Sequence, residues 1–194
     1  MNPRLALLSA IAILGTYTVT EHTLPRLLAD EKPIRSEVQK TDAGERILVQ
    51  EITIEAPVEA VWAAYTTKKG LETWMANQVE IDLRVGGTLR SRYDTTGKIG
   101  DPGTNTLHII NYVPNTLITL RAELESNWPE VLKQDADKLS NVVLFDRLSD
   151  KRTRVRSYGI GYSDKPEIEK LLEFFIPANE SLFAKMKRVV EKGS

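Results

Sequence analysis

The alternation of hydrophobic and charged residues is clearest between positions 79 and 93. From Val79 to Val85, aliphatic residues alternate with glutamate, aspartate and arginine, the period of a strand with one buried face. Gly86 and Gly87 follow, and such a pair supplies the positive backbone angles of a tight turn. The alternation then resumes up to Tyr93. The pattern predicts a β-hairpin over residues 79–93.

Further segments of strand character lie on both sides of this hairpin. They cover residues 47–55, 107–113, 117–124, 142–148 and 153–162. Pro114 and Asn115 form a turn pair between two of them. Residues 107–112 are apolar on both faces, so alternation does not say which way His108 points.

Three shorter helical segments are also expected. Pro57 suits the first turn of a helix, because the amide hydrogen that proline lacks would have no partner there, and a second short helix begins at Gly70. Trp62 and Trp74 lie in these two helices, where large aromatic residues usually pack in the core. The charged stretch 126–140 predicts a helical turn over one end of the sheet.

The last segment carries the strongest helical pattern. Asp164 and Glu167 have the spacing of a capping box, and Pro177 predicts a kink. One stripe faces the core with spacings of four and three residues: Ile168, Leu172, Phe175, Asn179, Leu182, Met186 and Val189. Asn179 is the polar member at the centre of this stripe.

The N-terminal residues have the pattern of an export signal. Arg4 precedes an apolar run over residues 5–14, which is the length of a signal-peptide core and short for a membrane span. We expect residues 1–20 to be a signal peptide, with an uncleaved anchor or a helix packed on the domain as alternatives. Residues 21–45, broken by Pro25 and Pro33, predict a linker, and residues 46–192 predict the domain.

Composition excludes several classes of function. The chain of 194 residues has a net charge of −1, which gives no global attraction for nucleic acid or anionic membranes. It contains no cysteine and two histidines, His22 and His108, so thiol catalysis and a multi-histidine metal site are excluded. We expect no metal, no cofactor and no nucleic-acid partner, with membrane contact only through an uncleaved N-terminal segment.

Several motifs resemble those of one protein family. They are Glu-x-Asp-Leu-Arg-x-Gly-Gly from residue 80, Ala-Pro-x-x-x-Val-Trp from 56, Gly-Leu-x-x-Trp from 70 and Gly-x-Gly-Tyr from 159. Together they resemble the branch named for activators of a heat-shock-protein ATPase (Aha-type) in the START and birch-pollen-allergen-like (SRPBCC) superfamily. This resemblance implies an α+β helix-grip fold, in which a curved antiparallel sheet wraps around a long C-terminal helix.

The resemblance also implies a cavity between sheet and helix, and with it a set of ligand-binding candidates. These are Asn179, Phe175, Ser91, Tyr93, His108, Tyr112 and Ser157, with Asp146 also considered. Each polar member has an alternative interpretation as a satisfied core group or a surface residue. Asn179 is the strongest candidate, because spacing alone fixes its position on the helix.

Three functions are compatible with these observations. The first is an exported, periplasmic or secreted, non-catalytic protein that binds a small hydrophobic or amphipathic molecule. The second is a small-molecule enzyme of the polyketide cyclase or aromatase type, using His108 and Tyr112. The third is a co-chaperone-like ATPase activator. No residue set for catalysis emerges from the sequence.

Overall fold

The computed structural model describes residues 34–124 and 128–193. The predicted signal peptide, residues 1–20, lies outside the described residues, as does the first part of the predicted linker. Among the described residues, no helix has the length and apolar character that crossing a bilayer requires.

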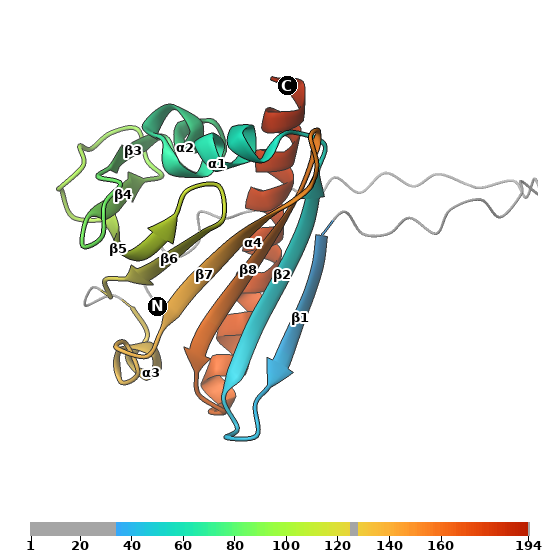
Figure 1. The fold of residues 1–194 in the computed structure, drawn as a ribbon. Helices are drawn as coiled ribbons and strands as arrows, with labels where there is room; N and C mark the ends of the chain where they lie inside the picture. Colours follow the sequence, from blue (N-terminus) through green and yellow to red (C-terminus); the bar gives the residue numbers. More distant parts are fainter. Residues whose placement is uncertain (1–33, 125–127, 194) are drawn as a thin grey trace, which may run out of the picture. The chain divides into compact units, whose positions relative to one another are not determined.

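The described residues form an eight-stranded antiparallel sheet with the order β1-β2-β8-β7-β6-β5-β4-β3 (Figure 1). From β3 to β8, each strand pairs with the next along the chain, and β2 pairs with β8. The strands are β1 Ile34–Lys40, β2 Arg46–Ile54, β3 Gln78–Ile81, β4 Thr88–Arg92, β5 Asn105–Val113, β6 Leu117–Ala122, β7 Ser140–Ser149 and β8 Arg152–Tyr162.

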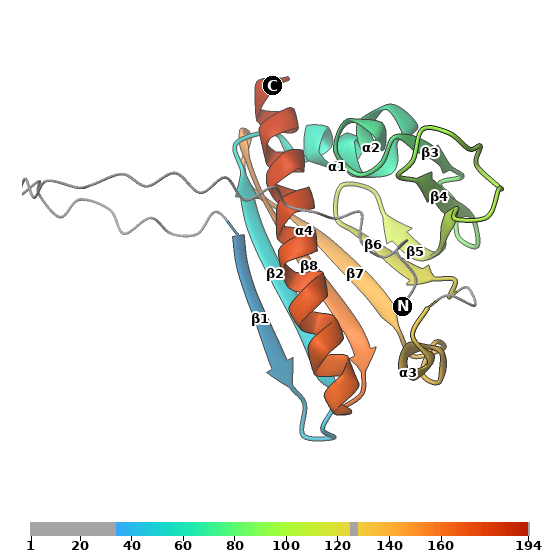
Figure 2. The same ribbon diagram turned by 180° about the vertical axis from the view of Figure 1, so that it is seen from behind.

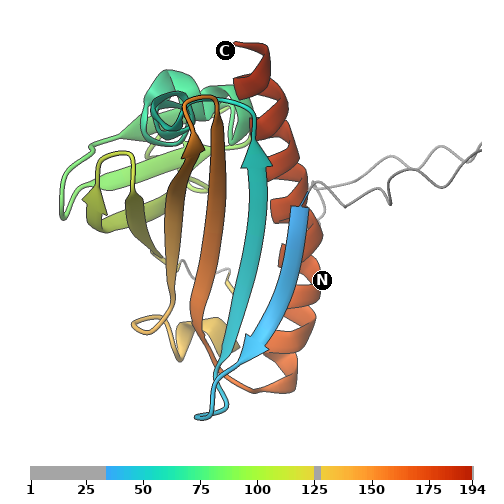
Figure 3. The same ribbon diagram turned by 45° about the vertical axis from the view of Figure 1, so that its right-hand side comes forward.

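One face of the sheet is covered by α4, which runs along its strands (Figure 2), and the other face carries no helix (Figure 3). Two short helices bridge β2 to β3, and a single turn precedes β7. The helices are α1 Val58–Thr66, α2 Lys68–Trp74, α3 Glu130–Lys133 and α4 Pro166–Lys192. The predicted α+β helix-grip class is therefore confirmed.

The edge strand β1 lies within residues 21–45, which the sequence predicted to be a linker. Seven residues, from Ile34 to Lys40, pair with β2. Ile34 is buried, whereas most of the other side chains are polar and open to solvent. Polar edge strands discourage pairing between molecules, and that polarity hides the alternation by which strands are predicted.

The predicted hairpin is present but shorter. β3 ends at Ile81, and Val85, expected on the buried face, is 63% exposed. The segment after Ile81 instead curls so that Gly86 donates its backbone N–H to Ile109 O and Gly87 O accepts from Ile109 N, each at 2.8 Å. Gly86 has a φ of +78°, which favours glycine. These two bonds extend the pairing of β4 with β5 beyond Thr88.

The buried face of α4 drifts from the predicted stripe in its second half. Phe183, Met186 and Val190 are buried, where the sequence predicted Leu182, Met186 and Val189. The predicted stripe assumed an average step of 3.5 residues, the period of a supercoiled helix. From Ile168 to Val190 the observed step is about 3.7 residues, close to that of a straight α-helix. Asn179 keeps its predicted place.

The start of α4 also differs from the prediction. The helix begins at Pro166, with Lys165 as N-cap and no side-chain cap, so Asp164 does not form the expected capping box. Proline disfavours helical geometry in the residue before it, which places Lys165 outside the helix. Its carbonyl accepts instead from the buried Arg46, with 2.9 Å between Arg46 Nη1 and Lys165 O.

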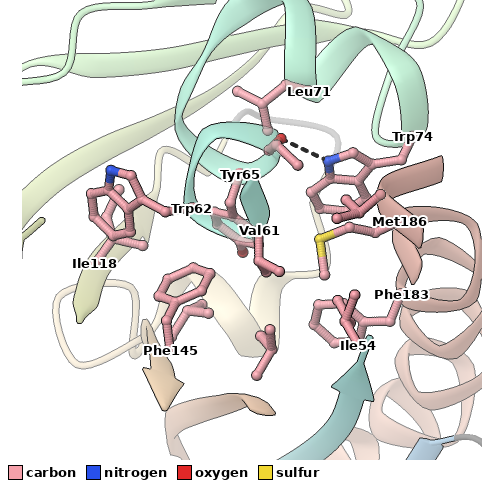
Figure 4. Close-up of a cluster of buried hydrophobic side chains, with 14 of the residues drawn as sticks. Ile54, Val61, Trp62, Tyr65, Leu71, Trp74, Ile118, Phe145, Phe183 and Met186 are labelled. Atoms are coloured by element: carbon pink, nitrogen blue, oxygen red, sulfur yellow. Dashed lines mark hydrogen bonds between the residues drawn. The ribbon is translucent and has the colours of Figure 1, made fainter. Parts of the chain in front are cut away.

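The main core lies between α1, α2, the second half of α4 and the sheet (Figure 4). Phe145 packs edge-on against Trp62 and Tyr65, with ring centroids 5.2 and 5.5 Å apart. Trp74 is buried, and its Nε1 donates to Ala64 O at 2.9 Å, the dashed line in Figure 4. Trp62 and Trp74 are therefore core residues, as their spacing predicted. A second apolar cluster surrounds Leu48, Leu132, Ile168 and Leu172.

Candidate functional site

A cavity of about 230 Å³ lies between the two apolar clusters, bounded by the sheet and α4. Most of its wall is aliphatic or aromatic, and a band of amide and hydroxyl side chains crosses it. The lining residues are Leu48, Gln50, Tyr65, Met75, Leu89, Leu107, Leu120, Ala122, Leu124, Trp128, Leu132, Leu139, Ser140, Asn141, Ser157, Gly159, Ile160, Tyr162, Phe175 and Asn179.

Three of the candidate ligand-binding residues, Asn179, Phe175 and Ser157, line this cavity. Asn179 and Phe175 reach it from α4 and Ser157 from β8. Ser157 is buried, and its hydroxyl donates to Asn141 Oδ1 on the neighbouring strand β7 at 2.9 Å. The structure thus brings together helix and strand residues that the sequence could only associate through the expected fold.

Asn179 belongs to a chain of hydrogen bonds that leads away from the cavity. Its Nδ2 donates to Gln50 Oε1 at 2.9 Å. Gln50, which is 1% exposed, donates from Nε2 to Ser36 Oγ at 3.1 Å and to Ile176 O at 3.3 Å. Ser36 in turn donates to Glu180 Oε1 at 2.7 Å. This network joins β1 and β2 to α4.

Two tyrosines on the cavity wall, Tyr65 and Tyr162, were not among the predicted site residues. Neither hydroxyl has a hydrogen-bond partner among the described residues, and burial raises the pKa of both above the usual range for tyrosine. Both phenols are therefore uncharged at neutral pH and can donate or accept. Tyr162 had a signal in the sequence, as it ends the Gly-x-Gly-Tyr motif.

The glycines of that motif shape the cavity wall. Gly161 has a φ of +86°, and a Cβ there would lie 2.2 Å from Lys138 O. A Cβ on Gly159 would meet the ring of Tyr162 at 3.0 Å. The motif therefore lets the end of β8 approach the segment before β7 and leaves room for the Tyr162 ring against the strand.

Three other candidates lie away from the cavity. Ser91 is buried on β4, opposite Val79 of β3. Tyr93 follows β4 and is 54% exposed. Tyr112 packs against Trp62 at a centroid distance of 6.4 Å, and its hydroxyl donates to Leu83 O at 3.4 Å. The structure therefore places Ser91 in the sheet, Tyr112 against the core and Tyr93 at the surface, all three away from the cavity.

His108 also lies outside the cavity. Leu107 lines the cavity and Ile109 is fully buried, so His108 between them is on the opposite face of the strand. Its side chain is 44% exposed, and its Nε2 lies 3.1 Å from Glu123 Oε2. The cyclase-type prediction depended on His108 at the cavity, and that support is lost.

Asp146 lies on the outer face of the sheet, where it receives hydrogen bonds from two arginines. Arg156 Nε and Arg154 Nε donate to its Oδ2 at 2.9 and 3.1 Å. Burial opposes ionisation of this carboxyl, but the bonds from Arg156 and Arg154 outweigh it and hold the pKa of Asp146 below its ordinary value. Asp146 is thus part of a surface ion-pair cluster.

Metal coordination has no candidate among the described residues, which contain no group of three or more histidine, aspartate or glutamate side chains with suitable placement. The cavity wall itself carries amide, hydroxyl and phenol groups as its polar side chains. Such groups can orient a ligand by hydrogen bonding.

Comparison with known proteins identifies the family. The profile described as "Activator of Hsp90 ATPase homolog 1-like protein" matches residues 55–191. No protein of curated function matches the chain.

Solved structures with the same fold include the Aha1 dimer of Colwellia psychrerythraea, with 18% identity and a TM-score of 0.57 over 76% of this chain and 98% of that one. Protein MLL2253 of Mesorhizobium loti has 19% identity and a TM-score of 0.59 over 77% and 99%. A Thalictrum norcoclaurine synthase mutant bound to a transition-state analogue has 14% identity and a TM-score of 0.51 over 82% and 98%. These likenesses establish the fold alone.

Proposed function

This chain belongs to the family of activator of Hsp90 ATPase homolog 1-like proteins, in the SRPBCC superfamily, and from that premise we propose that it binds a small, largely apolar molecule without chemical conversion. The ligand occupies the cavity between the sheet and α4. The observation that carries this proposal is the wall of that cavity, which is apolar over most of its area and crossed by a few polar side chains. Ligand sites commonly have this composition.

The size of the cavity limits the ligand. An apolar cavity of about 150 Å³ holds benzene, and this cavity measures about 230 Å³. A molecule with one or two rings, or a short branched hydrocarbon, fits that volume. A long acyl chain or a sterol does not fit without movement of the wall.

The absence of conversion rests on the cavity's chemistry. Among the described residues that line it, there is no histidine, carboxylate, lysine or arginine. The tyrosines are the titratable groups of the wall, and burial raises their pKa. Neither observation supports proton transfer at neutral pH. The co-chaperone alternative has support only from the family description.

Export is part of the proposal, supported by the apolar run over residues 5–14 after Arg4 and by the polar residues that follow. An exported binding protein would meet its ligand outside the cytosol. Residues 1–20 act as the signal, with an uncleaved anchor as the other outcome.

A screen of one- and two-ring molecules against the purified protein tests the proposal, with native mass spectrometry and thermal shift as readouts. We expect at least one neutral apolar compound to bind. Ala122→Leu adds a side chain to the cavity wall and should abolish that binding. The volume it fills favours folding, so its stability should stay equal or rise by ~0.5–2 kcal/mol.

Ala63→Leu is the matched control. Ala63 is exposed on α1, outside the cavity wall, so the same added volume should leave ligand binding unchanged. Turnover of a bound compound would replace the binding function with an enzymatic one. Equal binding by the native protein and Ala122→Leu would place the ligand elsewhere.

A further inference from the structure

We infer that the cavity selects uncharged ligands that carry a hydroxyl group, such as phenols and alcohols, over their methyl ethers and over carboxylates. The inference rests on the proposed function, since it names the chemical class of the ligand for the same cavity. It follows from the direction of the hydrogen bonds that end at Asn179.

The direction of these hydrogen bonds is fixed by the acceptors at the end farthest from the cavity. The Glu180 carboxylate and the Ile176 carbonyl can only accept hydrogen bonds. Ser36 therefore uses its hydroxyl proton on Glu180, at 2.7 Å, and accepts from Gln50. Gln50 uses both Nε2 hydrogens, one on Ser36 Oγ and one on Ile176 O.

This arrangement fixes the amide of Gln50, and through it the amide of Asn179. With Nε2 of Gln50 committed to two acceptors, its Oε1 must face Asn179. An oxygen needs a donor opposite, so Asn179 presents Nδ2 to Gln50 and keeps Oδ1 free. No described residue donates to Asn179 Oδ1, and Asn179 lines the cavity. Asn179 thus gives the cavity a hydrogen-bond acceptor whose orientation the protein fixes.

The two tyrosines of the wall adapt to the ligand. The hydroxyls of Tyr65 and Tyr162 have no partner among the described residues and can rotate to donate or accept. A ligand hydroxyl donates to Asn179 Oδ1 and accepts from a tyrosine or from the second Nδ2 hydrogen. A methyl ether satisfies the donors but leaves Asn179 Oδ1 without a partner, and an unpaired buried acceptor is costly.

Charge excludes carboxylates. No lysine, arginine or histidine is present among the described residues of the wall, so nothing offsets the loss of hydration of an anion. The charge that ends the hydrogen-bond chain is the Glu180 carboxylate, which has the same sign as such a ligand. The site therefore favours a neutral molecule.

A matched series of two-ring probes tests this inference at neutral pH: naphthalene, 2-naphthol, 2-methoxynaphthalene and 2-naphthoate. Calorimetry or fluorescence titration gives the four affinities for the full chain. We expect 2-naphthol to bind about fivefold or more tightly than its methyl ether, with 2-naphthoate weakest. Asn179→Leu should bring the naphthol-to-ether ratio close to one while naphthalene still binds. Asn111→Leu, the same substitution at an exposed position of β5 outside the cavity wall, should keep the ratio.

Naphthalene binding shows that a variant retains its cavity, and Asn179→Ala serves as a second variant if Asn179→Leu does not fold. Equal affinities for 2-naphthol and its ether in the native protein would overturn the inference, as would a ratio that persists in both Asn179 variants or tightest binding by 2-naphthoate. In each of those results the proposed function survives. Binding of none of the four probes would instead contradict the proposed function and remove the basis of the inference.

Discussion

Gln50 and Asn179 are 129 positions apart in the chain, and the Nδ2 of Asn179 lies 2.9 Å from the Oε1 of Gln50. This contact ties β2, the neighbour of the edge strand β1, to α4 at the wall of the cavity. Gln50 extends it to Ser36 on β1, so the edge strand, the sheet and the helix share one polar network. The network both supports the fold and orients the polar group offered to a ligand.

Replacing Gln50 tests the structural part of that role. Gln50→Leu removes the acceptor of Asn179 Nδ2 and the side-chain donor to Ser36 Oγ and Ile176 O. We expect the free energy of unfolding to fall by ~1–3 kcal/mol. Urea denaturation measures it. Gln39→Leu, on the exposed side of β1, is the control and should change stability little. Equal stability of the two variants would mean that the buried amide is not needed for folding.

The aromatic centre of the main core offers a second test. Phe145 contacts both Trp62 and Tyr65 edge-on and is 3% exposed. Phe145→Ala should lower the free energy of unfolding by ~3–5 kcal/mol, because it removes a buried ring and leaves a void. Leu148→Ala on the same strand, where Leu148 is 46% exposed, should cost far less. A small loss of unfolding free energy in Phe145→Ala would show that the neighbouring side chains repack to fill the void.

Acid should weaken the fold through Asp146. Its pKa in the folded protein is lowered by Arg156 and Arg154, whereas unfolded aspartate titrates near ~3.9. The stabilisation is thus fully present above about pH 4 and is lost as pH falls through the folded pKa. At neutral pH, the free energy of unfolding of Asp146→Asn should be lower than that of the native protein. As the pH falls, it should decrease less than that of the native protein. Urea denaturation between pH 2.5 and 7 checks this, with Asp150→Asn at the exposed hairpin tip as the control.

Much of the fold follows from the sequence because its segments carry strong local signals. The hairpin at 79–93, the two short helices and the C-terminal helix each combine a periodic pattern with turn or proline chemistry. β1 lacks such a signal: it is an edge strand, and its polar side chains mask the strand period. The phase of α4 beyond Asn179 was also mispredicted, because a strict alternation of four and three residues describes a supercoil rather than a straight helix.

The site was less predictable than the fold, for reasons visible in particular residues. Asn179 could be placed because one polar residue interrupts an apolar stripe. His108 could not, since apolar residues on both faces of β5 leave its direction open until the register is known. Gln50 went unnoticed because a single polar side chain in a strand gives no sign of a partner more than a hundred residues away.

Export can be tested with the protein in its natural host. The apolar run over residues 5–14 predicts cleavage that leaves a mature chain beginning near Glu21. Intact mass or Edman sequencing of the mature protein reads this directly. Leu8→Arg interrupts the run and should cause the full-length precursor to accumulate, whereas Leu24→Arg, after the predicted cleavage point, should not. A soluble cytosolic protein that retains Met1 would contradict export.

The phase of α4 can be read from two adjacent valines. Val190 is 7% exposed and faces the core, while Val189 is only partly buried. The same substitution to alanine removes the same two methyl groups at both positions. Burial of each is worth about 0.8 kcal/mol, so Val190→Ala should lower the free energy of unfolding by roughly 1.6 kcal/mol, and Val189→Ala by clearly less. Chemical denaturation of both variants gives the difference. The strict four-and-three stripe makes the opposite prediction, because it places Val189 inward. A larger loss of unfolding free energy in Val189→Ala than in Val190→Ala would therefore support that stripe and contradict a core position for Phe183.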